Sequence, residues 1–333
     1  MRRFVAIASA SAVALIWACG GDGTSAVDAG ADASADRVVP DTSPPLDVIQ
    51  SDTSQLPDID GGPMCDPGKP FDPPTLVAEL DTSGTEASLR LSFDQLTAYF
   101  TSSRPGGQGG QDLWVATRAK VTDAFSNIKN LDTQDSPQVD THASITADGL
   151  TLVYESTRIS PSQSVFVAKR ADTMSAFGQP NGITGLGNFA IVTDPFVRAD
   201  GQKLYFAAAP NGGDLDIFRA NRSGKNFIGT TNVGELNSQA QEELPTVSPD
   251  DRLMYIASTR VEPNAQGGFD IWVSTRYSVN APFTSPTLVK ELNTPTDDFP
   301  DYVSPDGCTL YFHRSQSGDG GPTKAIWAAH KSM

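Results

Sequence analysis

Residues 301–312 read Asp-Tyr-Val-Ser-Pro-Asp-Gly-Cys-Thr-Leu-Tyr-Phe, and versions of this stretch recur along the chain. It contains two apolar, β-favouring segments separated by Ser-Pro-Asp-Gly. In such a turn proline supplies a φ of about −65° and glycine tolerates a positive φ. The stretch therefore predicts two strands joined by a tight turn. A second clear copy lies at 245–250, Pro-Thr-Val-Ser-Pro-Asp.

The turn aspartate recurs five times, at intervals of 50 to 56 residues. An aromatic residue follows each aspartate after 18 to 22 residues, and a base lies four residues beyond the aromatic residue. The aspartates are Asp94, Asp148, Asp200, Asp250 and Asp306, and the aromatic residues are Trp114, Phe166, Phe218, Trp272 and Trp327. A repeat of this length with room for four short strands is typical of a β-propeller blade. The aromatic residues are expected to fill the core between blades.

The ends of the repeat array predict how the propeller closes. The fifth repeat stops after its third strand, whereas residues 74–80 precede the first repeat and nearly copy the fourth strand expected at 286–292. We therefore predict an all-β, five-bladed β-propeller over residues 70–333. The N-terminal strand would complete the last blade, so that no sheet edge stays free.

Residues 1–18 have the pattern of a lipoprotein signal peptide. Arg2 and Arg3 precede an apolar run, 4–18, that is too short to span a bilayer comfortably. The sequence Leu-Ile-Trp-Ala-Cys at 15–19 resembles the bacterial lipobox, which implies a lipid anchor on Cys19. The alternative is an ordinary secretory peptide. Either way the protein is expected to be exported, and Gly20 implies sorting to the outer membrane, facing the periplasm or the cell surface.

Residues 19–69 are predicted to be a disordered acidic tether. Between positions 20 and 69 lie ten aspartates, two basic residues, six prolines and no aromatic residue. Such a segment cannot bury enough apolar surface to offset its chain entropy. The whole chain of 333 residues carries a net charge of −16, which disfavours nucleic-acid binding.

The repeat resembles a known family in the Ser-Pro-Asp-Gly and Leu-Tyr-Phe segments and in Gly-Gly-Phe-Asp-Ile-Trp at 267–272. It is similar there to the TolB-like family of Pro-Asp β-propeller repeats, over roughly residues 74–333. The resemblance implies a fold rather than an activity. The family's Ser-x-Arg after the second strand is matched by Arg104, Arg158 and Arg260. Pro210 and Gln316 replace that arginine, which implies two blades without the usual loop hydrogen bonding.

Few residues carry an obvious chemistry. His142, His313 and His330 show no metal-ligand spacing and are interpreted as structural. With Cys19 lipidated, Cys65 and Cys308 remain. The turn that holds Cys308 is expected on the same face as the start of the N-terminal strand, and an exported protein can keep a disulfide, so we predict that these two cysteines pair. The alternative is two free thiols.

One acidic residue per blade lies at or just before the first strand. The innermost strand of a blade lines the central channel, so one hypothesis is that these carboxylates gather at one mouth of it as a binding site. They are Glu86, Asp140, Asp194, Glu243 and Asp298. The favoured interpretation is that each caps its own connecting loop. A cationic ligand group or calcium is the candidate occupant, and no other cofactor is expected.

These observations favour a non-catalytic, monomeric cell-envelope lipoprotein whose propeller is a binding scaffold. Its partner would be an envelope protein or a peptidoglycan-associated component. The alternative is a secreted carbohydrate-active enzyme, or a sugar-binding propeller, that uses carboxylates in the channel. The acids follow the repeat itself, which favours binding over catalysis.

Overall fold

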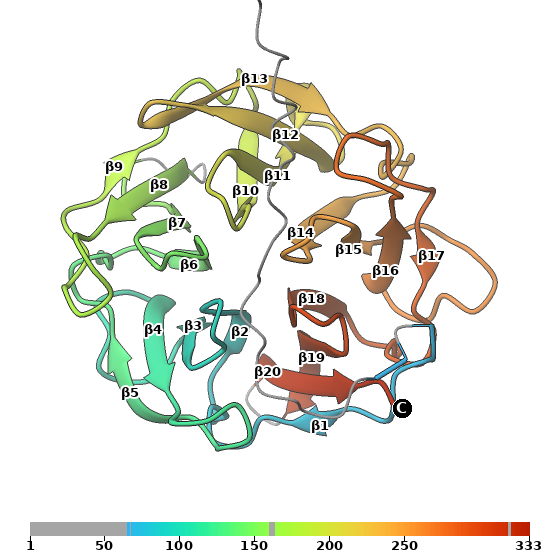
Figure 1. Ribbon diagram of the computed structural model, residues 1–333, viewed down its shortest axis with the longest axis horizontal. Coiled ribbons are helices and arrows are strands. Elements are labelled where there is room, and N and C mark those ends of the chain that lie inside the picture. The colour runs from blue at the N-terminus through green and yellow to red at the C-terminus, as the bar shows by residue number, and fades with distance from the viewer. Residues whose placement is uncertain (1–64, 67, 160–163, 319–320) are drawn as a thin grey trace, which may run out of the picture. The chain divides into compact units, whose positions relative to one another are not determined.

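The computed structural model describes residues 65–66, 68–159, 164–318 and 321–333. Five four-stranded antiparallel sheets surround a common centre (Figure 1). The five-bladed all-β propeller predicted from the repeat is confirmed. Among the described residues, no helix has the length and apolar character needed to cross a membrane.

Blades 1 to 4 each consist of four strands consecutive in sequence, the first of them nearest the centre. The bounds are β2 (Glu86–Leu91), β3 (Thr97–Ser102), β4 (Asp112–Thr117) and β5 (Ser126–Asn130) in blade 1; β6 (Asp140–Ile145), β7 (Thr151–Ser156), β8 (Ser164–Lys169) and β9 (Asn181–Gly182) in blade 2; β10 (Ile191–Val197), β11 (Lys203–Ala209), β12 (Asp216–Ser223) and β13 (Asn226–Asn232) in blade 3; and β14 (Glu242–Val247), β15 (Leu253–Ser258), β16 (Asp270–Thr275) and β17 (Thr287–Leu288) in blade 4. A short 3-10 helix, Pro210–Gly212, follows β11.

The fifth blade joins the two ends of the propeller, as predicted. It contains β18 (Asp298–Val303), β19 (Thr309–Gly318), β20 (Gly321–His330) and the N-terminal strand β1 (Thr75–Leu76), which pairs with β20. β1 is shorter than predicted because the chain turns immediately after it, where the Leu80 amide donates to the Val77 carbonyl. Both of these side chains are buried, so the residues that resembled a strand are apolar for packing instead.

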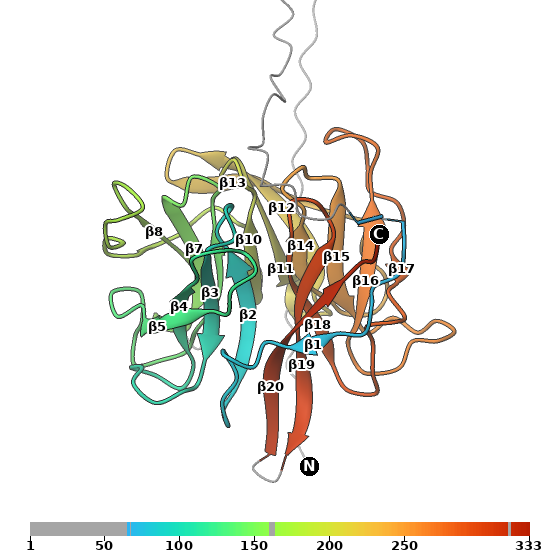
Figure 2. The same cartoon turned by 60° about the horizontal axis from the view of Figure 1, so that its bottom comes forward.

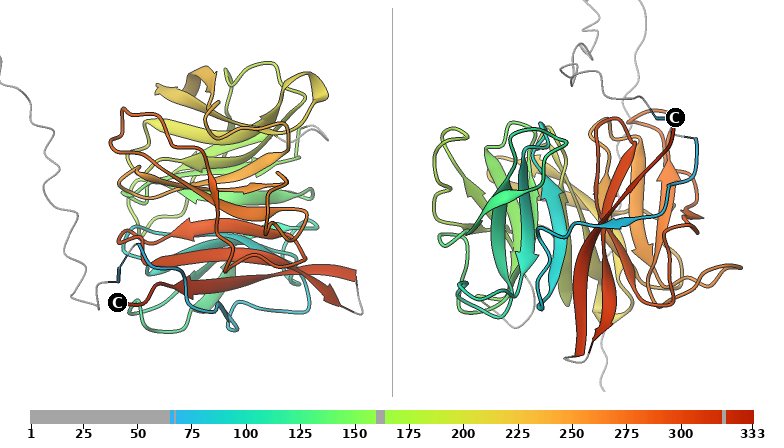
Figure 3. Two further views of the ribbon diagram at one scale, coloured as in Figure 1. Left: turned by 90° about the vertical axis from the view of Figure 1, so that its right-hand side faces the viewer. Right: turned by 90° about the horizontal axis from the view of Figure 1, so that it is seen from below.

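The hairpin of β19 and β20 is the longest element of the propeller. Both strands have ten residues, and they extend past the other blades on one face (Figures 2 and 3). Its inner part pairs with β18 as far as Arg314, which lies opposite Asp298.

The predicted disulfide between Cys65 and Cys308 is confirmed, with 5.7 Å between the Cα atoms. Beside it the Asp66 amide donates to the Ser332 carbonyl at 3.1 Å. Both contacts hold the chain that leads into β1 against the end of β20, so residues near 65 already belong with the propeller. Cys19, the predicted signal peptide and the tether as far as residue 64 lie outside the described residues.

The core lies between neighbouring blades. One cluster joins Tyr99 and Leu113 of blade 1 to Tyr154 and Phe166 of blade 2. Trp272, from the aromatic series of the repeat, is fully buried in the cluster shared by blades 3 and 4. Contacts of this kind fix how each blade is rotated against the next, and they set the positions of the first strands around the centre.

Candidate functional site

The first strands of blades 1 to 4 share an irregularity that turns side chains toward the centre. Each has a β-bulge. Within each bulge one non-glycine residue has a φ of 50° to 55°, a left-handed conformation that is strained for such residues. These residues are Ser88, His142, Asp194 and Leu244.

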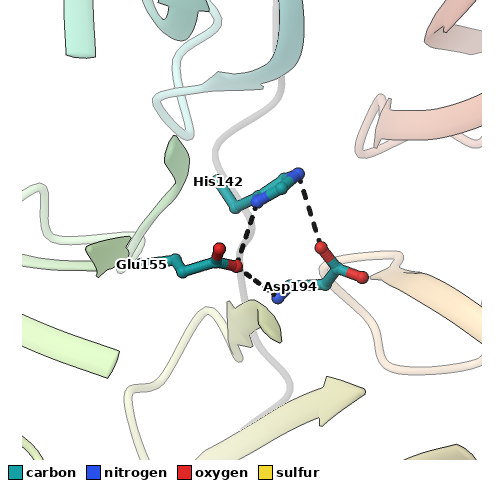
Figure 4. A group of neighbouring side chains, drawn as sticks. All are labelled: His142, Glu155 and Asp194. Atoms are coloured by element: carbon teal, nitrogen blue, oxygen red, sulfur yellow. Dashed lines mark hydrogen bonds and ion pairs between the residues drawn. The ribbon is translucent and has the colours of Figure 1, made fainter. Parts of the chain in front are cut away.

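His142 and Asp194 meet at the centre, because they occupy equivalent positions of adjacent blades. The imidazole of His142 lies between two carboxylates (Figure 4). Its Nδ1 is 3.2 Å from an oxygen of Glu155 on β7, and its Nε2 is 3.4 Å from an oxygen of Asp194 on β10. The side chain of His142 keeps 21 % of its surface exposed, whereas Glu155 and Asp194 are almost wholly buried. The imidazole is thus the accessible part of the group.

Glu155 is fixed by donors from the next blade. Its Oε2 accepts hydrogen bonds from the Thr193 hydroxyl at 2.6 Å and from the Asp194 amide at 3.1 Å. Its other oxygen, Oε1, is buried and has no hydrogen-bond partner among the described residues. Asp194 in turn accepts a hydrogen bond from the Leu244 amide of blade 4. The group therefore links three blades.

The pKa values follow from this geometry. Burial alone would lower the pKa of His142, but Asp194 and Glu155 raise it above its ordinary value. Burial acts on Glu155 in the opposite sense, yet His142 and the donated hydrogen bonds leave its pKa below the usual range. The pKa of Asp194 is raised by burial, an effect that His142 only partly offsets. His142 and Glu155 therefore form an ion pair.

A third carboxyl group, Glu243 of β14, stands beside the pair. Burial, together with the charge of Asp194, raises its pKa to about 8. Nothing in the described part of the chain donates a hydrogen bond to it. Lys324 of β20 adds a positive charge that opposes the rise, and its ammonium lies 4.6 Å from the centre of the Phe299 ring. Together we call His142, Glu155, Asp194, Glu243 and Lys324 the central site.

The structure separates the five predicted carboxylates into two sets. Asp194 and Glu243 belong to the central site, whereas Glu86, Asp140 and Asp298 are fully buried and cap the loops before their own strands. Each of these three lies beside an arginine of the same blade: Arg104, Arg158 and Arg314 respectively. The hypothesis that all five gather at one mouth is therefore wrong for these three, and the favoured interpretation, that each caps its own connecting loop, is confirmed for them, because the first position of the strand faces the loop and not the centre.

The equivalent of these three caps in blade 4 is Glu242 and not the predicted Glu243. Glu242 lies opposite Ser258, accepts from its hydroxyl at 2.8 Å, and pairs with Arg260 at 2.9 Å. In blade 3 the corresponding position opposite Ala208 is Val192, so that blade lacks the cap. Glu242 lies eight residues before Asp250, the same offset that separates Glu86, Asp140 and Asp298 from their own turn aspartates, so a constant offset would have selected it in place of Glu243.

Blade 5 also departs from the expectation based on Gln316. Arg314, two residues earlier, takes the role of the missing arginine: it contacts Asp298 at 2.5 Å and donates to the Leu292 carbonyl at 2.6 Å. Of the two blades expected to lack this bonding, only blade 3 does so among the described residues, since Pro210 has no such side chain.

Sequence reasoning missed His142, Glu155 and Lys324. His142 had been interpreted as structural because no ligand lay at a metal-binding spacing in the sequence. A signal was present nonetheless, since His142 and Asp194 are 52 residues apart, which is one repeat length. The other two histidines lie elsewhere: His313 is buried against Asp301, and His330 is exposed beside Thr309.

A hollow lies at the other end of the first strands, where it is lined by their last residues and by Arg90, Phe196 and Tyr302. Arg90 is buried, and its guanidinium lies 5.1 Å from the centre of the Phe196 ring. Burial lowers the pKa of Arg90 to about 10, against the charges of Asp301 and Asp194. Arg90 thereby places a cation between this hollow and the central site.

Comparison with known proteins finds similar solved structures at low identity. No family model matches the chain, and no curated protein matches it. Solved structures do match: TolB from Acinetobacter baumannii (11 % identity, TM-score 0.47, 76 % of this chain and 56 % of that chain) and the catalytic domain of an α-L-arabinofuranosidase from Coprinopsis cinerea (10 %, 0.49, 79 % and 96 %). An exo-β-1,3-galactanase from Phanerochaete chrysosporium also matches (11 %, 0.46, 76 % and 64 %). This chain thus spans just over half of that TolB. At such identities the likeness concerns the fold alone.

Proposed function

We propose that the protein is a non-catalytic, exported binding propeller whose central site receives a cationic group of its partner. Three carboxyl groups, Glu155, Asp194 and Glu243, surround one imidazole. Glu243 is partly exposed and accepts no hydrogen bond from the described chain. An ammonium or guanidinium group would supply the donor that its carboxylate lacks, and the positive charge of that group would favour the ionised form over the neutral form that burial favours. This unpaired carboxyl group is the observation that carries the proposal.

Binding is favoured over catalysis by how the acids are used. Glycoside hydrolysis needs two carboxyl groups that both face the sugar. Here Glu155 and Asp194 are almost wholly buried. They already accept hydrogen bonds, from the Thr193 hydroxyl and the Leu244 amide respectively. Only Glu243 keeps a free carboxyl group toward the centre.

The cellular setting is proposed from the sequence. Cys19 would carry the lipid anchor, and the acidic segment as far as residue 64 would hold the propeller away from the outer membrane. The partner would be an envelope protein or a peptidoglycan-associated component that presents a lysine-like or amino-sugar group. The protein would act as a monomer.

Calorimetry on the full mature chain tests the proposal, with 1,5-diaminopentane as a minimal cationic probe and purified peptidoglycan fragments as a second one. We expect the diamine to bind the parent protein and Glu262→Gln equally, because Glu262 is exposed in the loop after β15 and does not belong to the central site. Glu243→Gln should bind at least tenfold more weakly. Absence of diamine binding, or equal binding by Glu243→Gln, would contradict the proposal.

A second candidate is a carbohydrate-active enzyme, favoured by one observation. The pKa of Glu243, raised to about 8, is that of a carboxyl group able to act as a general acid. Chromogenic arabinosides and galactosides test this candidate directly. Turnover by the parent protein that is lost in Glu243→Gln would establish the enzyme and displace the binding proposal.

A further inference from the structure

A repeated clamp joins the start of the third strand to the chain entering the next blade. At the junction of blades 3 and 4, the Ile217 amide donates to Asn237 Oδ1 at 2.8 Å, and Asn237 Nδ2 donates back to the Ile217 carbonyl at 3.0 Å. Asn293 makes the same two bonds with Ile271 at the junction of blades 4 and 5, at 2.7 and 3.1 Å. The amide fits because it has one acceptor and one donor.

Asp135 occupies this place between blades 1 and 2. Its Oδ1 accepts from the Leu113 amide at 2.9 Å, as the asparagines do. Its Oδ2 stands where the donating nitrogen would be, and it has no hydrogen-bond partner in the described chain although Asp135 is only 7 % exposed. An ionised carboxylate has no hydrogen to offer the Leu113 carbonyl, whereas a protonated one has.

The surroundings favour the neutral form. Asp135, Asp112 and Asp140 bring one oxygen each within 4.8 Å of one another. Among the described residues, Arg158 is the cation that contacts this group, and it pairs with Asp140 at 2.6 Å. Tyr154 directs its hydroxyl to the Gln134 carbonyl, so that it does not donate to the group.

Asp112 and Asp140 accept hydrogen bonds from their own loops, whereas one oxygen of Asp135 accepts none in the described chain. Asp140 accepts from the Ser136 amide and hydroxyl, and Asp112 accepts from the Gly109 amide at 2.8 Å. Burial raises the pKa of Asp135 to about 7, with Asp112 and Asp140 adding to the rise and the Leu113 amide opposing it. The side chain of Asn130 opposes the rise as well, and its Nδ2 lies 3.4 Å from the Leu113 carbonyl oxygen.

We propose that Asp135 holds a proton, which it donates to the Leu113 carbonyl, and that this proton makes the junction of blades 1 and 2 a pH-sensitive clamp. Loss of the proton places a carboxylate against a carbonyl oxygen and two further carboxylates. Asparagine holds the same clamp at two other junctions without any dependence on pH. A divalent cation shared by the three carboxylates is the competing explanation, and Arg158 already occupies the cation's place beside Asp140.

The sign of the pH dependence follows from linkage. In the unfolded chain Asp135 ionises near its ordinary value of 3.8, whereas in the folded chain it ionises near 7. The folded state therefore binds more protons in this window, and its stability falls as the pH rises from about 4 to about 7, then stays level. Three pKa units correspond to a change of about a thousandfold in the unfolding constant as an upper figure.

Chemical unfolding of the mature chain between pH 4.5 and 8.5 tests the clamp in the parent protein, Asp135→Asn and Asn293→Asp. We expect Asp135→Asn to remove the excess loss of stability between pH 5 and 7.5, by about 10- to 100-fold in the unfolding constant relative to the parent protein. Asn293→Asp should introduce a similar pH-dependent loss of stability at the junction of blades 4 and 5. The carboxyl carbon of Asp135, followed by NMR in the parent protein, should titrate near pH 7.

Two results would overturn the proposal. One is a carboxyl signal of Asp135 that titrates below pH 5, with parallel pH profiles for the parent protein and Asp135→Asn. The other is a rise in stability of the parent protein at pH 8 on addition of millimolar calcium that Asp135→Asn does not show, because the three carboxylates would then bind a metal ion.

Discussion

Replacing Arg260 by methionine should unfold the loop cap of blade 4. Its guanidinium donates to the Leu236 carbonyl at 2.6 Å, to Glu242 at 2.9 Å and to the Ser258 hydroxyl at 3.0 Å. It also lies 5.1 Å from the centre of the Trp272 ring. Methionine keeps much of the apolar volume and removes the charge and all three donors.

The expected loss in the free energy of unfolding follows from the carboxylate that Arg260 would leave without its ionic partner. Glu242 is fully buried, so removal of its partner leaves a buried carboxylate that only the Ser238 and Ser258 groups still satisfy. Breaking a buried ion pair from one side costs about 3–5 kcal/mol. We expect a loss of this size in the free energy of unfolding, and a Tm lower by at least several degrees.

Urea unfolding of the full mature chain measures this loss. Arg252→Met is the matched control, since Arg252 is exposed and its change should cost no more than about 0.5 kcal/mol. Adding Glu242→Gln to Arg260→Met should recover part of the stability, because the uncompensated charge is removed. A cost below about 1 kcal/mol, or no recovery in the double variant, would refute the reasoning that the arginine stabilises a buried carboxylate.

Two further predictions concern the ends of the chain. Cys308→Ser should lower the free energy of unfolding by up to about 5 kcal/mol, since the bond closes a loop over a sequence separation of 243 residues; equal stability with and without reductant in the parent protein would contradict it. Cys19→Ala should release the protein from the membrane fraction, and unchanged fractionation would count against the lipid anchor.

Local chemistry explains why much of the fold could be predicted. The turn with proline, aspartate and glycine, the following Leu-Tyr-Phe strand and the aromatic third strand recur in phase, and the unused copy at 74–80 indicated the closure. The pairing of Cys65 with Cys308 followed from that topology. The strands expected at 74–80 and 286–292 were overestimated, since β1 and β17 have two residues each. After β1 the apolar residues pack in a turn and mimic a strand pattern.

The central site was only partly predictable. Asp194 and Glu243 were selected, but Glu86, Asp140 and Asp298 proved to be loop caps, because a β-bulge decides which residue faces the centre. The sequence does not mark the position of a bulge when the left-handed residue is not glycine. His142 and Glu155 meet Asp194 only through the packing of two blades, which spacing along one chain does not reveal.

The protonation state of His142 tests the central claim most directly, because the account places a charged imidazole, together with the Lys324 ammonium, among the carboxyl groups of the central site. A ¹⁵N NMR titration of the imidazole in the full mature chain would measure it. We predict a midpoint above 6.5, the ordinary value, that falls in Asp194→Asn, together with a change of the His142 signals on addition of 1,5-diaminopentane. A midpoint at or below 6.5, with signals that do not respond to the diamine, would contradict the account.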